Sequence, residues 1–355
     1  MPNSTPSKEP PARSAKMAGR IVVGVAAVVG VCSLSVLGVR ALRKADLPLS
    51  LLPSALNGLV PRKPTHQWQL VKGKHWQIVA ADVAEPMETT DTLENNRGEC
   101  PSGMVQVKGQ MKLDPAPQSV EELQKKTCTK WISREYPERC AEFDRGQWLE
   151  ISKEFAAKSM NYCMDRFEYP NQRGAYPVLM VNFHEANEMC AEQGKRLCNE
   201  EEWTFACEGE EAMPYPYGYV RDTEACVIDH TWRAYNEKAM QQRDGLAVML
   251  ELDRLWQGVA SGSRPKCKSA FGIYDLTGNI DEWTRSVRSW ERPSILKGGY
   301  WGTVRTRCRP ATRSHNENHT FYQQGFRCCA DPGTTLRVHS FTPDPATAPL
   351  PRELK

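Results

Sequence analysis

Cysteine is the residue type that most constrains how this chain can fold. The 355-residue sequence has 13 cysteines; Cys32 stands apart, and the other 12 all lie between Cys100 and Cys329. An even number of cysteines in one polar region is typical of a disulfide framework in an oxidising compartment. Zinc is the competing interpretation, but no C-x-x-C pair occurs, so that spacing of zinc ligands is absent. We therefore predict disulfide bonds and a periplasmic or extracellular location for this region.

An uncharged apolar segment, Ile21–Val39, is the second constraint. As a helix its 19 residues would span about 28 Å, close to the hydrocarbon thickness of a bilayer. A cleaved signal peptide is the alternative, although no clean small-residue cleavage site follows the segment. We predict an uncleaved single-pass transmembrane anchor, with a disordered cytoplasmic tail at residues 1–20.

Composition divides the rest of the chain into four parts. Residues 40–98 contain several prolines and leucine runs and are predicted to form a stalk or linker. Residues 99–157 are interpreted as an N-terminal extension of the ectodomain, residues 158–331 as its main domain, and residues 332–355 as a loose tail. The net charge is +3 and no stripe of lysine and arginine appears, so no nucleic-acid partner is expected.

Capping residues and periodicity predict few helices in the ectodomain. They are expected at Ser119–Ile132, at Asn182–Gly194, after Asn199 with Glu202 completing a capping box, and at Arg243–Gln257. In the last of these, Leu246, Met249, Leu250 and Trp256 are expected on one face. Short strands and loops rich in glycine and proline fill the intervals. We predict an α+β domain with much irregular structure, stapled by disulfides.

The order of six short motifs resembles one protein family. The motifs are "MDRFEYPN", "FHEANEMCAEQGKRLCNEEEWTFACEG", "PYPYG", "FGIYDLTGNIDEW", "LKGGYW" and "GFRC". Over about residues 158–331 the sequence is similar to the sulfatase-modifying factor domain, the domain of formylglycine-generating enzyme. The resemblance implies a C-type-lectin-like fold. The family includes copper-dependent oxidases, other tailoring enzymes and non-catalytic components, and fold alone does not choose among them.

The family's oxidase site depends on a cysteine pair that binds copper(I). In this sequence the first position is Thr303 and the second is Cys308. One thiolate and a threonine cannot form a bis-thiolate site for a soft ion, so copper is not expected. A catalytic role for Cys308 as a free thiol remains the alternative. The iron-binding histidine motif of the sulfoxide-synthase relatives is missing, so no iron is expected either.

The resemblance also implies disulfide partners. It pairs Cys190 with Cys328 and Cys207 with Cys308. Two further pairs, Cys163 with Cys198 and Cys226 with Cys267, are proposed among the remaining cysteines. Cys100, Cys128, Cys140 and Cys329 stay unassigned.

A calcium site is expected in "DLTGNIDEW". Asp275 and Glu282 are hard oxygen ligands on either side of a turn at Gly278, the mixture that calcium prefers. The family binds calcium through the positions of Asp275, Gly278, Ile280 and Glu282, the middle two by backbone oxygen. The alternative is a turn in which both carboxylates only cap backbone N–H groups. Val227 occupies a ligand position of the family's second calcium site, which puts that site in doubt.

Other charged motifs favour structural roles. Asp165, Arg166 and Glu168 of "MDRFEYPN" are interpreted as part of a structural strand and turn, and "SHNENH" as a solvated loop. Arginines alternate at positions 305, 307, 309 and 313, so that in a strand they would line one face. Arg305 and Arg307 could then bind an anionic ligand or peptide carboxylates, although a solvated edge is equally consistent.

The sequence therefore predicts a membrane-anchored envelope protein whose domain is a non-catalytic binding or assembly module with an envelope protein or peptide as partner. The alternative is an oxidative tailoring enzyme acting on a secreted peptide or protein. Copper-dependent formation of formylglycine on a sulfatase is a third reading.

Overall fold

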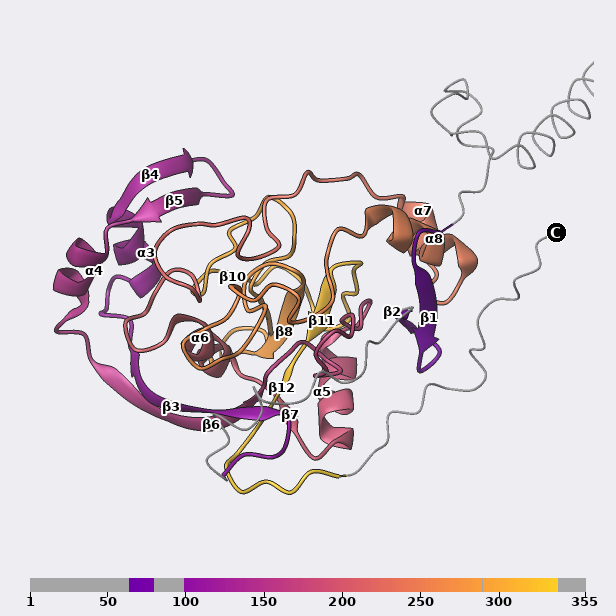
Figure 1. Ribbon diagram of the computed structural model, residues 1–355, viewed down its shortest axis with the longest axis horizontal. Coiled ribbons are helices and arrows are strands. Elements are labelled where there is room, and N and C mark those ends of the chain that lie inside the picture. The colour runs from indigo at the N-terminus through magenta and orange to yellow at the C-terminus, as the bar shows by residue number, and fades with distance from the viewer. Residues whose placement is uncertain (1–63, 80–98, 289, 338–355) are drawn as a thin grey trace, which may run out of the picture. The chain divides into compact units, whose positions relative to one another are not determined.

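A computed structural model describes residues 64–79, 99–288 and 290–337 (Figure 1). The chain divides into two units, residues 1–63 and 64–355, and every described residue belongs to the second. The predicted anchor at residues 21–39 and Cys32 thus lie outside the described residues. Within the described ranges, no helix has both the length and the apolar character needed to cross a membrane.

A hairpin begins the described part of the chain. Strands β1 (Gln67–Val71) and β2 (His75–Val79) pair antiparallel, and the turn between them places Lys72 and Gly73 at positive φ. Trp76 and Ile78 are buried. The prediction of a linker through residue 98 is therefore wrong for residues 64–79, because alternating aromatic and aliphatic side chains give this segment a buried face.

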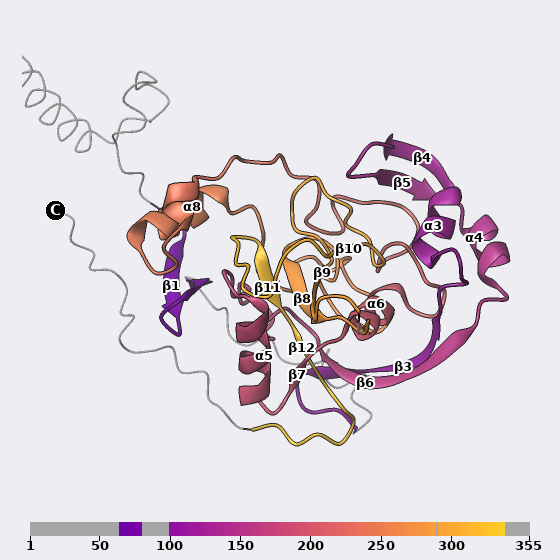
Figure 2. The same ribbon diagram turned by 180° about the vertical axis from the view of Figure 1, so that it is seen from behind.

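A four-stranded sheet joins the segment before residue 158 to the main domain. Strand β3 (Met104–Lys112) pairs along its whole length with β6 (Ala157–Asp165), as Figure 2 shows from behind. Strands β12 (Cys328–Ala330) and β7 (Arg196–Leu197) complete the order β3-β6-β12-β7. The extension at residues 99–157 thus contributes a strand to the central sheet.

The helix predicted at Ser119–Ile132 is shorter than expected. Helix α3 spans Val120–Lys126, with the predicted capping box between Ser119 and Glu122. Residues Cys128–Ser133 instead form strand β4, paired with β5 (Arg139–Phe143). The β-branched and aromatic residues of this stretch favour a strand, and the Cys128–Cys140 disulfide ties it to its partner. Helix α4 (Arg145–Ser152) follows.

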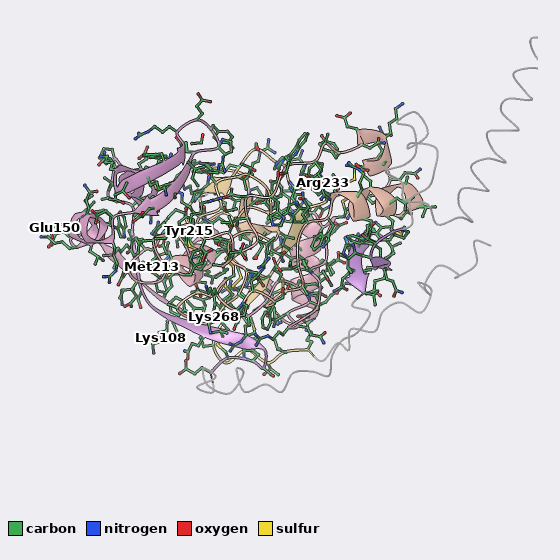
Figure 3. The ribbon with its side chains drawn as sticks, turned by 45° about the horizontal axis from the view of Figure 1, so that its top comes forward. Lys108, Glu150, Met213, Tyr215, Arg233 and Lys268 are labelled. Atoms are coloured by element: carbon green, nitrogen blue, oxygen red, sulfur yellow. A yellow bond between two sulfur atoms is a disulfide. The ribbon has the colours of Figure 1, made fainter. Side chains whose placement is uncertain are left out.

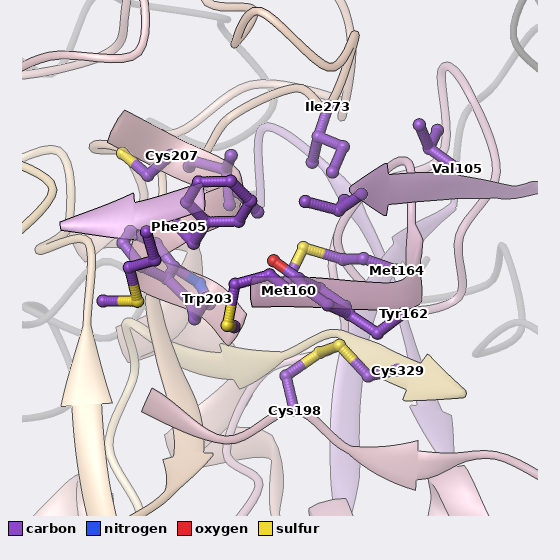
Figure 4. Close-up of a cluster of buried hydrophobic side chains, with 14 of the residues drawn as sticks. Val105, Met160, Tyr162, Met164, Cys198, Trp203, Phe205, Cys207, Ile273 and Cys329 are labelled. Atoms are coloured by element: carbon purple, nitrogen blue, oxygen red, sulfur yellow. A yellow bond between two sulfur atoms is a disulfide. The ribbon is translucent and has the colours of Figure 1, made fainter. Parts of the chain in front are cut away.

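Two helices of the main domain begin where capping predicted. Helix α5 (Phe183–Glu192) starts after Asn182, and Gly194 beyond it has positive φ. Helix α6 (Glu200–Glu208) starts after Asn199, and Glu202 completes the predicted capping box. Trp203 and Phe205 of α6 are fully buried among side chains of β3 and β6 in the cluster of Figure 4. Side chains fill the spaces between these ribbons in Figure 3.

The candidate functional loops are attached to a second sheet, of order β10-β9-β8-β11. Its strands are β8 (Asp281–Arg285), β9 (Ser294–Lys297), β10 (Ala311–Thr312) and β11 (Gln324–Phe326). Strands β8 and β11 run parallel, whereas the other pairs are antiparallel. Lys297 ends β9, and burial lowers its pKa to about 7.

The segment between α6 and β8 in the sequence packs against the N-terminal hairpin. Helix α7 (Glu237–Met240) precedes α8 (Leu246–Leu255), which is shorter than the predicted Arg243–Gln257 because Gly245 is its N-cap. Leu246 is exposed and not on the buried face as expected, whereas Leu252 packs in one cluster with Trp76 of β2.

Six disulfides join all 12 cysteines between Cys100 and Cys329. The pairs are Cys100–Cys163, Cys128–Cys140, Cys190–Cys328, Cys198–Cys329, Cys207–Cys308 and Cys226–Cys267. The proposed pair of Cys163 with Cys198 is wrong. Successive side chains of β6 point to opposite faces: Met164 lies in the cluster of Cys198 and Cys329 (Figure 4), whereas Cys163 packs with Cys100.

The described part of the chain continues after the last strand to residue 337. The backbone N–H of Gly333 donates to the carbonyl of Glu99, and that of Arg337 donates to the carbonyl of Gln193. The loose tail predicted from residue 332 therefore does not include residues 332–337, and residues 338–355 lie outside the described ranges.

Candidate functional site

The loop between β9 and β10 contains Thr303 and Cys308, the two positions at which the resemblance implies the copper-binding pair of the oxidases. Cys308 is fully buried and bonded to Cys207 of α6. At the other position of the expected copper pair, the Thr303 hydroxyl donates to the carbonyl oxygen of His230 at 3.3 Å. Neither side chain offers a thiolate. The residues present therefore do not fit a bis-thiolate copper site.

Two glycines give this loop its sharp entry. Gly298 and Gly299 both have positive φ. A Cβ atom on Gly298 would lie 2.9 Å from the carbonyl oxygen of Leu276, and one on Gly299 would lie 2.7 Å from the Cγ2 of Thr306. The "KGG" turn thus fixes the path of the loop and seats it against the Asp275–Glu282 segment.

A cavity of about 340 Å³ lies beneath the loop. Its polar lining includes Asp281, Tyr300, Thr303, Arg305, His315 and Gln323. Burial raises the pKa of Asp281 to about 7, although the Gly299 backbone N–H stabilises the carboxylate. Tyr136, which is largely exposed, stands at the rim with its ring 5.1 Å from the Arg305 guanidinium. A cavity of this size with mixed hydroxyl, carboxyl and imidazole groups fits a small polar ligand or a short peptide segment.

Two histidines of "SHNENH" are more ordered than the predicted solvated loop. The rings of His315 and His319 stack with their centroids 3.9 Å apart. Burial lowers the pKa of both imidazoles, and each is half-buried. The spacing of four residues between them is the signal in the sequence that would have identified this pair.

The alternating arginines do not form one ligand-binding face. Arg307 is buried and contacts Glu121 at 3.3 Å and Gln124 at 3.2 Å. Arg309 forms two hydrogen bonds to the carboxylate of Glu208. Of the two expected ligand-binding residues, only Arg305 lines the cavity beneath the loop, because Arg307 is directed into the protein.

The segment expected to bind calcium contributes Asp275 and Glu282 to a buried acidic cluster. Glu282 accepts two hydrogen bonds from Arg327, at 2.6 and 2.7 Å, and a third from Trp203 at 2.9 Å. The carboxylate of Asp275 accepts the Gly262 N–H at 2.7 Å. Asp275 itself has positive φ, as does Gly278 in the same turn.

Glu168 completes this cluster, and sequence reasoning assigned it only a structural role. One carboxylate oxygen accepts hydrogen bonds from Ser261 and Asn279, both at 2.7 Å, while the other, Oε1, is buried without a partner. Burial, with Asp275 and Glu282 nearby, raises the pKa of Glu168 well above its usual value. Burial likewise raises the pKa of Asp275 to about 7.

The cluster brings three carboxyl groups together, with Arg327 hydrogen-bonded to Glu282 and the charge of Arg173 acting on Asp275. Within the described ranges, no three His, Cys, Asp or Glu side chains have the arrangement of a metal site by themselves. Backbone oxygens of Gly278 and Ile280 would therefore have to supply ligands beside Asp275, Glu282 and the unpartnered Glu168 oxygen, a donor set that fits calcium. Val227, at the doubtful second site, is buried in an apolar cluster.

Comparison with known proteins establishes the family. The sequence profile of the sulfatase-modifying factor enzyme 1-like domain matches residues 89–332. The chain belongs to this family. The match includes the strand β3 and the helices α3 and α4, which lie N-terminal to the motifs quoted above.

Curated relatives in the family differ in what their names say of activity. The chain is 30% identical over 167 residues to inactive C-alpha-formylglycine-generating enzyme 2 of Bos taurus, covering 44% of this chain and 51% of that protein. It is 26% identical over 179 residues to formylglycine-generating enzyme of Mus musculus, 45% of each chain. It is 27% identical over 187 residues to the Mycobacterium tuberculosis formylglycine-generating enzyme, 45% of this chain and 59% of that one. The chain thus spans about half the length of these relatives.

Proposed function

We propose that this family member is a non-catalytic binding module with a C-type-lectin-like scaffold, which presents a ligand cavity on a disulfide-stapled domain outside the cytoplasm. One observation carries the proposal. Cys308, at the second position of the expected cysteine pair, forms a disulfide with Cys207 and offers no free thiol, and Thr303 occupies the first position. A relative whose name includes the word inactive supports the same reading.

The ligand of the proposed module is a peptide segment or small polar molecule of an envelope partner. The cavity beneath the loop offers hydroxyl groups of Thr303 and Tyr300, the carboxyl group of Asp281 and the guanidinium of Arg305. This mixture suits the amides and polar side chains of an extended peptide better than a purely apolar ligand.

Conversion of a cysteine peptide tests the absence of oxidase activity. The full-length chain, incubated with copper, a thiol reductant and oxygen, should leave the cysteine of the peptide unchanged when the products are analysed by mass spectrometry. A formylglycine-generating enzyme serves as the positive control. Formation of a peptide aldehyde would overturn the proposal and restore the alternative of an oxidative tailoring enzyme.

We also propose that Ile21–Val39 anchors the protein, with its N-terminus in the cytoplasm. Six disulfides in the described ranges support an oxidising compartment for the domain. A reporter enzyme that is active only outside the cytoplasm, fused after Lys355, should be active. Activity of a cytoplasmic reporter at the same position would contradict both the anchor and the compartment.

The metal of this module is proposed to be calcium with a structural role. The ion would be held by Asp275, Glu282 and Glu168 together with the backbone oxygens of Gly278 and Ile280. It would neutralise the buried carboxylates and fix the segment on which the "KGG" turn rests. Neither copper nor iron has a role in the proposal.

A further inference from the structure

A second cavity, of about 600 Å³, shares Ala311 of β10 with the one beneath the loop. Its lining includes Met111 of β3, Glu200 and Thr204 of α6, and Lys297 at the end of β9. Val287 and Trp290, from the connection between β8 and β9, stand at its rim. We name it the Lys297 cavity. The proposed function uses none of these side chains.

Lys297 is the buried cation of this cavity. Lys297 is only 2% exposed, and its ammonium group donates to the carbonyl oxygen of Arg309 at 2.8 Å. It also lies 5.4 Å from the ring centre of Trp203. An ammonium group has three N–H donors, so two of them have no protein acceptor among the described residues.

The other charges of the cavity are already matched. Every acidic residue of the lining has a basic partner within ion-pairing distance: Asp114 pairs with Arg309, Glu121 with Arg305 and Arg307, Glu200 with Arg313, and Glu201 with Lys158. Arg288, the remaining arginine of the lining, pairs with Glu291 at 3.0 Å. Within the ranges that the structure describes, Lys297 is thus the one charged lining residue with no oppositely charged side chain in contact.

Burial lowers the pKa of Lys297 to about 7, because a buried ammonium group without a contacting counter-ion is costly, and a bound oxyanion would favour its charged form. The rim adds an apolar preference, because Trp290 is 81% exposed and Val287 is 46% exposed. An indole that stands so far out of the protein offers a flat surface to a ligand that enters the cavity.

We propose that the Lys297 cavity binds an organic carboxylate with an apolar substituent. The carboxylate accepts hydrogen bonds from the two free N–H donors of Lys297, and the apolar group packs against Trp290 and Val287. The carboxylate belongs either to a free organic acid or to the C-terminus of a peptide that ends in an apolar residue. Both sources share the same chemistry at Lys297.

Isothermal titration calorimetry of the full-length chain tests this proposal on the unmodified protein. The probes are 3-phenylpropionate, its neutral amide, inorganic phosphate, and an acetylated peptide ending in phenylalanine with a free or an amidated terminus. Loss of one charge-assisted interaction should weaken binding of each amide by about tenfold or more relative to its acid. Tighter binding of the free-terminus peptide than of 3-phenylpropionate identifies a protein end as the source, and the reverse identifies a free acid. Equal binding of acid and amide, phosphate binding as tight as the acid, or no binding at all would overturn the proposal.

Two variants locate the binding. Lys297→Met should abolish the difference between acid and amide, whereas Lys297→Arg should retain much of it because the charge remains. Trp290→Ala changes an exposed residue, so the variant should fold normally. It should weaken the binding of 3-phenylpropionate by about fivefold, as expected for a lost aromatic contact. Binding that is unchanged in Trp290→Ala, with acid and amide still distinguished in Lys297→Met, would place the ligand elsewhere and contradict the assignment. If Lys297→Met fails to fold, the ligand series on the unmodified chain and Trp290→Ala still decide the question.

Discussion

Two neighbouring segments of this protein differ in how many of the metal ligands implied by the family resemblance are present. The Asp275–Glu282 segment retains every position expected to bind calcium, and Glu168 adds an unpartnered oxygen beneath it. The Lys297–Arg313 loop keeps the glycines of its entry but has Thr303 in place of one thiol and places Cys308 in a disulfide. Function must therefore be transferred within this family residue by residue.

The chemistry of the two ions explains why the segments differ. A calcium site takes hard oxygen donors, and two of those expected here are backbone carbonyls that no substitution removes. A copper(I) site takes two soft thiolates, for which the backbone has no substitute. A single cysteine-to-threonine change is enough to remove the bis-thiolate site, whereas the calcium site depends on side-chain oxygens at only two of its four expected positions.

The largest effect on the free energy of unfolding should come from removing the Cys207–Cys308 disulfide. Cys207 and Cys308 are separated by 101 residues, but with the Cys198–Cys329 disulfide intact their bond closes a loop of only about 30 residues, whose entropy corresponds to about 3.7 kcal/mol. Urea unfolding of a Cys207→Ala/Cys308→Ala variant should report a loss of about this size. Cys128→Ala/Cys140→Ala is the matched control, because its separation of 12 residues predicts about 3 kcal/mol. A smaller loss for the first variant than for the control would show that the loop does not depend on its disulfide.

The pH dependence of stability should separate the calcium-free from the calcium-bound protein. The pKa of Asp275 is raised to about 7, so the native state favours its protonated form. The contribution of this group to the free energy of unfolding, about 4 kcal/mol at most, is fully present below its unfolded pKa of about 4. It is lost as the pH rises through about 7. With EDTA, unfolding at pH 5 and pH 8 should show about two-thirds of this loss, because part of it has already occurred between pH 4 and pH 5. With calcium, the loss should largely disappear because the ion favours the carboxylate. The same pH profile with and without calcium would remove the ion from the account.

Glu168→Gln sharpens the assignment of the calcium ligands. The amide lacks the charge that the ion requires, so stabilisation by calcium, about 2.7 kcal/mol at a concentration 100 times the dissociation constant, should be lost. In EDTA the variant should be at least as stable as the unmodified protein, because an uncharged group replaces a buried carboxyl. Glu150→Gln, at an exposed position of α4, should retain the full response. Calcium stabilisation that survives Glu168→Gln would exclude this residue as a ligand.

The smallest effect is expected at Arg305. This side chain is partly exposed and contacts Glu121 at 3.4 Å, so Arg305→Ala should change the free energy of unfolding by less than about 1 kcal/mol. Arg307→Ala should cost more, because Arg307 is buried, and its loss leaves the buried Oε1 of Gln124 without a donor and removes one of the two arginines that contact Glu121. Equal losses in chemical denaturation would show that the two arginines have equivalent surroundings, as the alternating sequence pattern suggested.

Much of the fold could be predicted because local signals agreed with the tertiary structure. The capping boxes at Ser119 and Asn199 marked the starts of α3 and α6, and the motif order indicated the family. The end of α3 could not be found in the same way, because its helical periodicity continues into residues that pair with β5. A strand of this kind depends on a partner that is distant in sequence.

The candidate site was less predictable, since burial decides what its residues do. Arg305 and Arg307 look equivalent in sequence, yet only Arg305 lines the cavity. Glu168 lies more than 100 residues from Asp275, and no local pattern joins them. Cys163 could be excluded as a partner of Cys198 only once the strand register assigned their side chains to opposite faces of the sheet.

Disulfide mapping by mass spectrometry of the unreduced, alkylated protein, with metal analysis of the same sample, tests the central claim most directly. The account predicts that all 12 cysteines from Cys100 to Cys329 are paired, that Cys207 is joined to Cys308, and that the bound metal is calcium. Alkylation of Cys308 together with stoichiometric copper would contradict it and return this loop to oxidase chemistry.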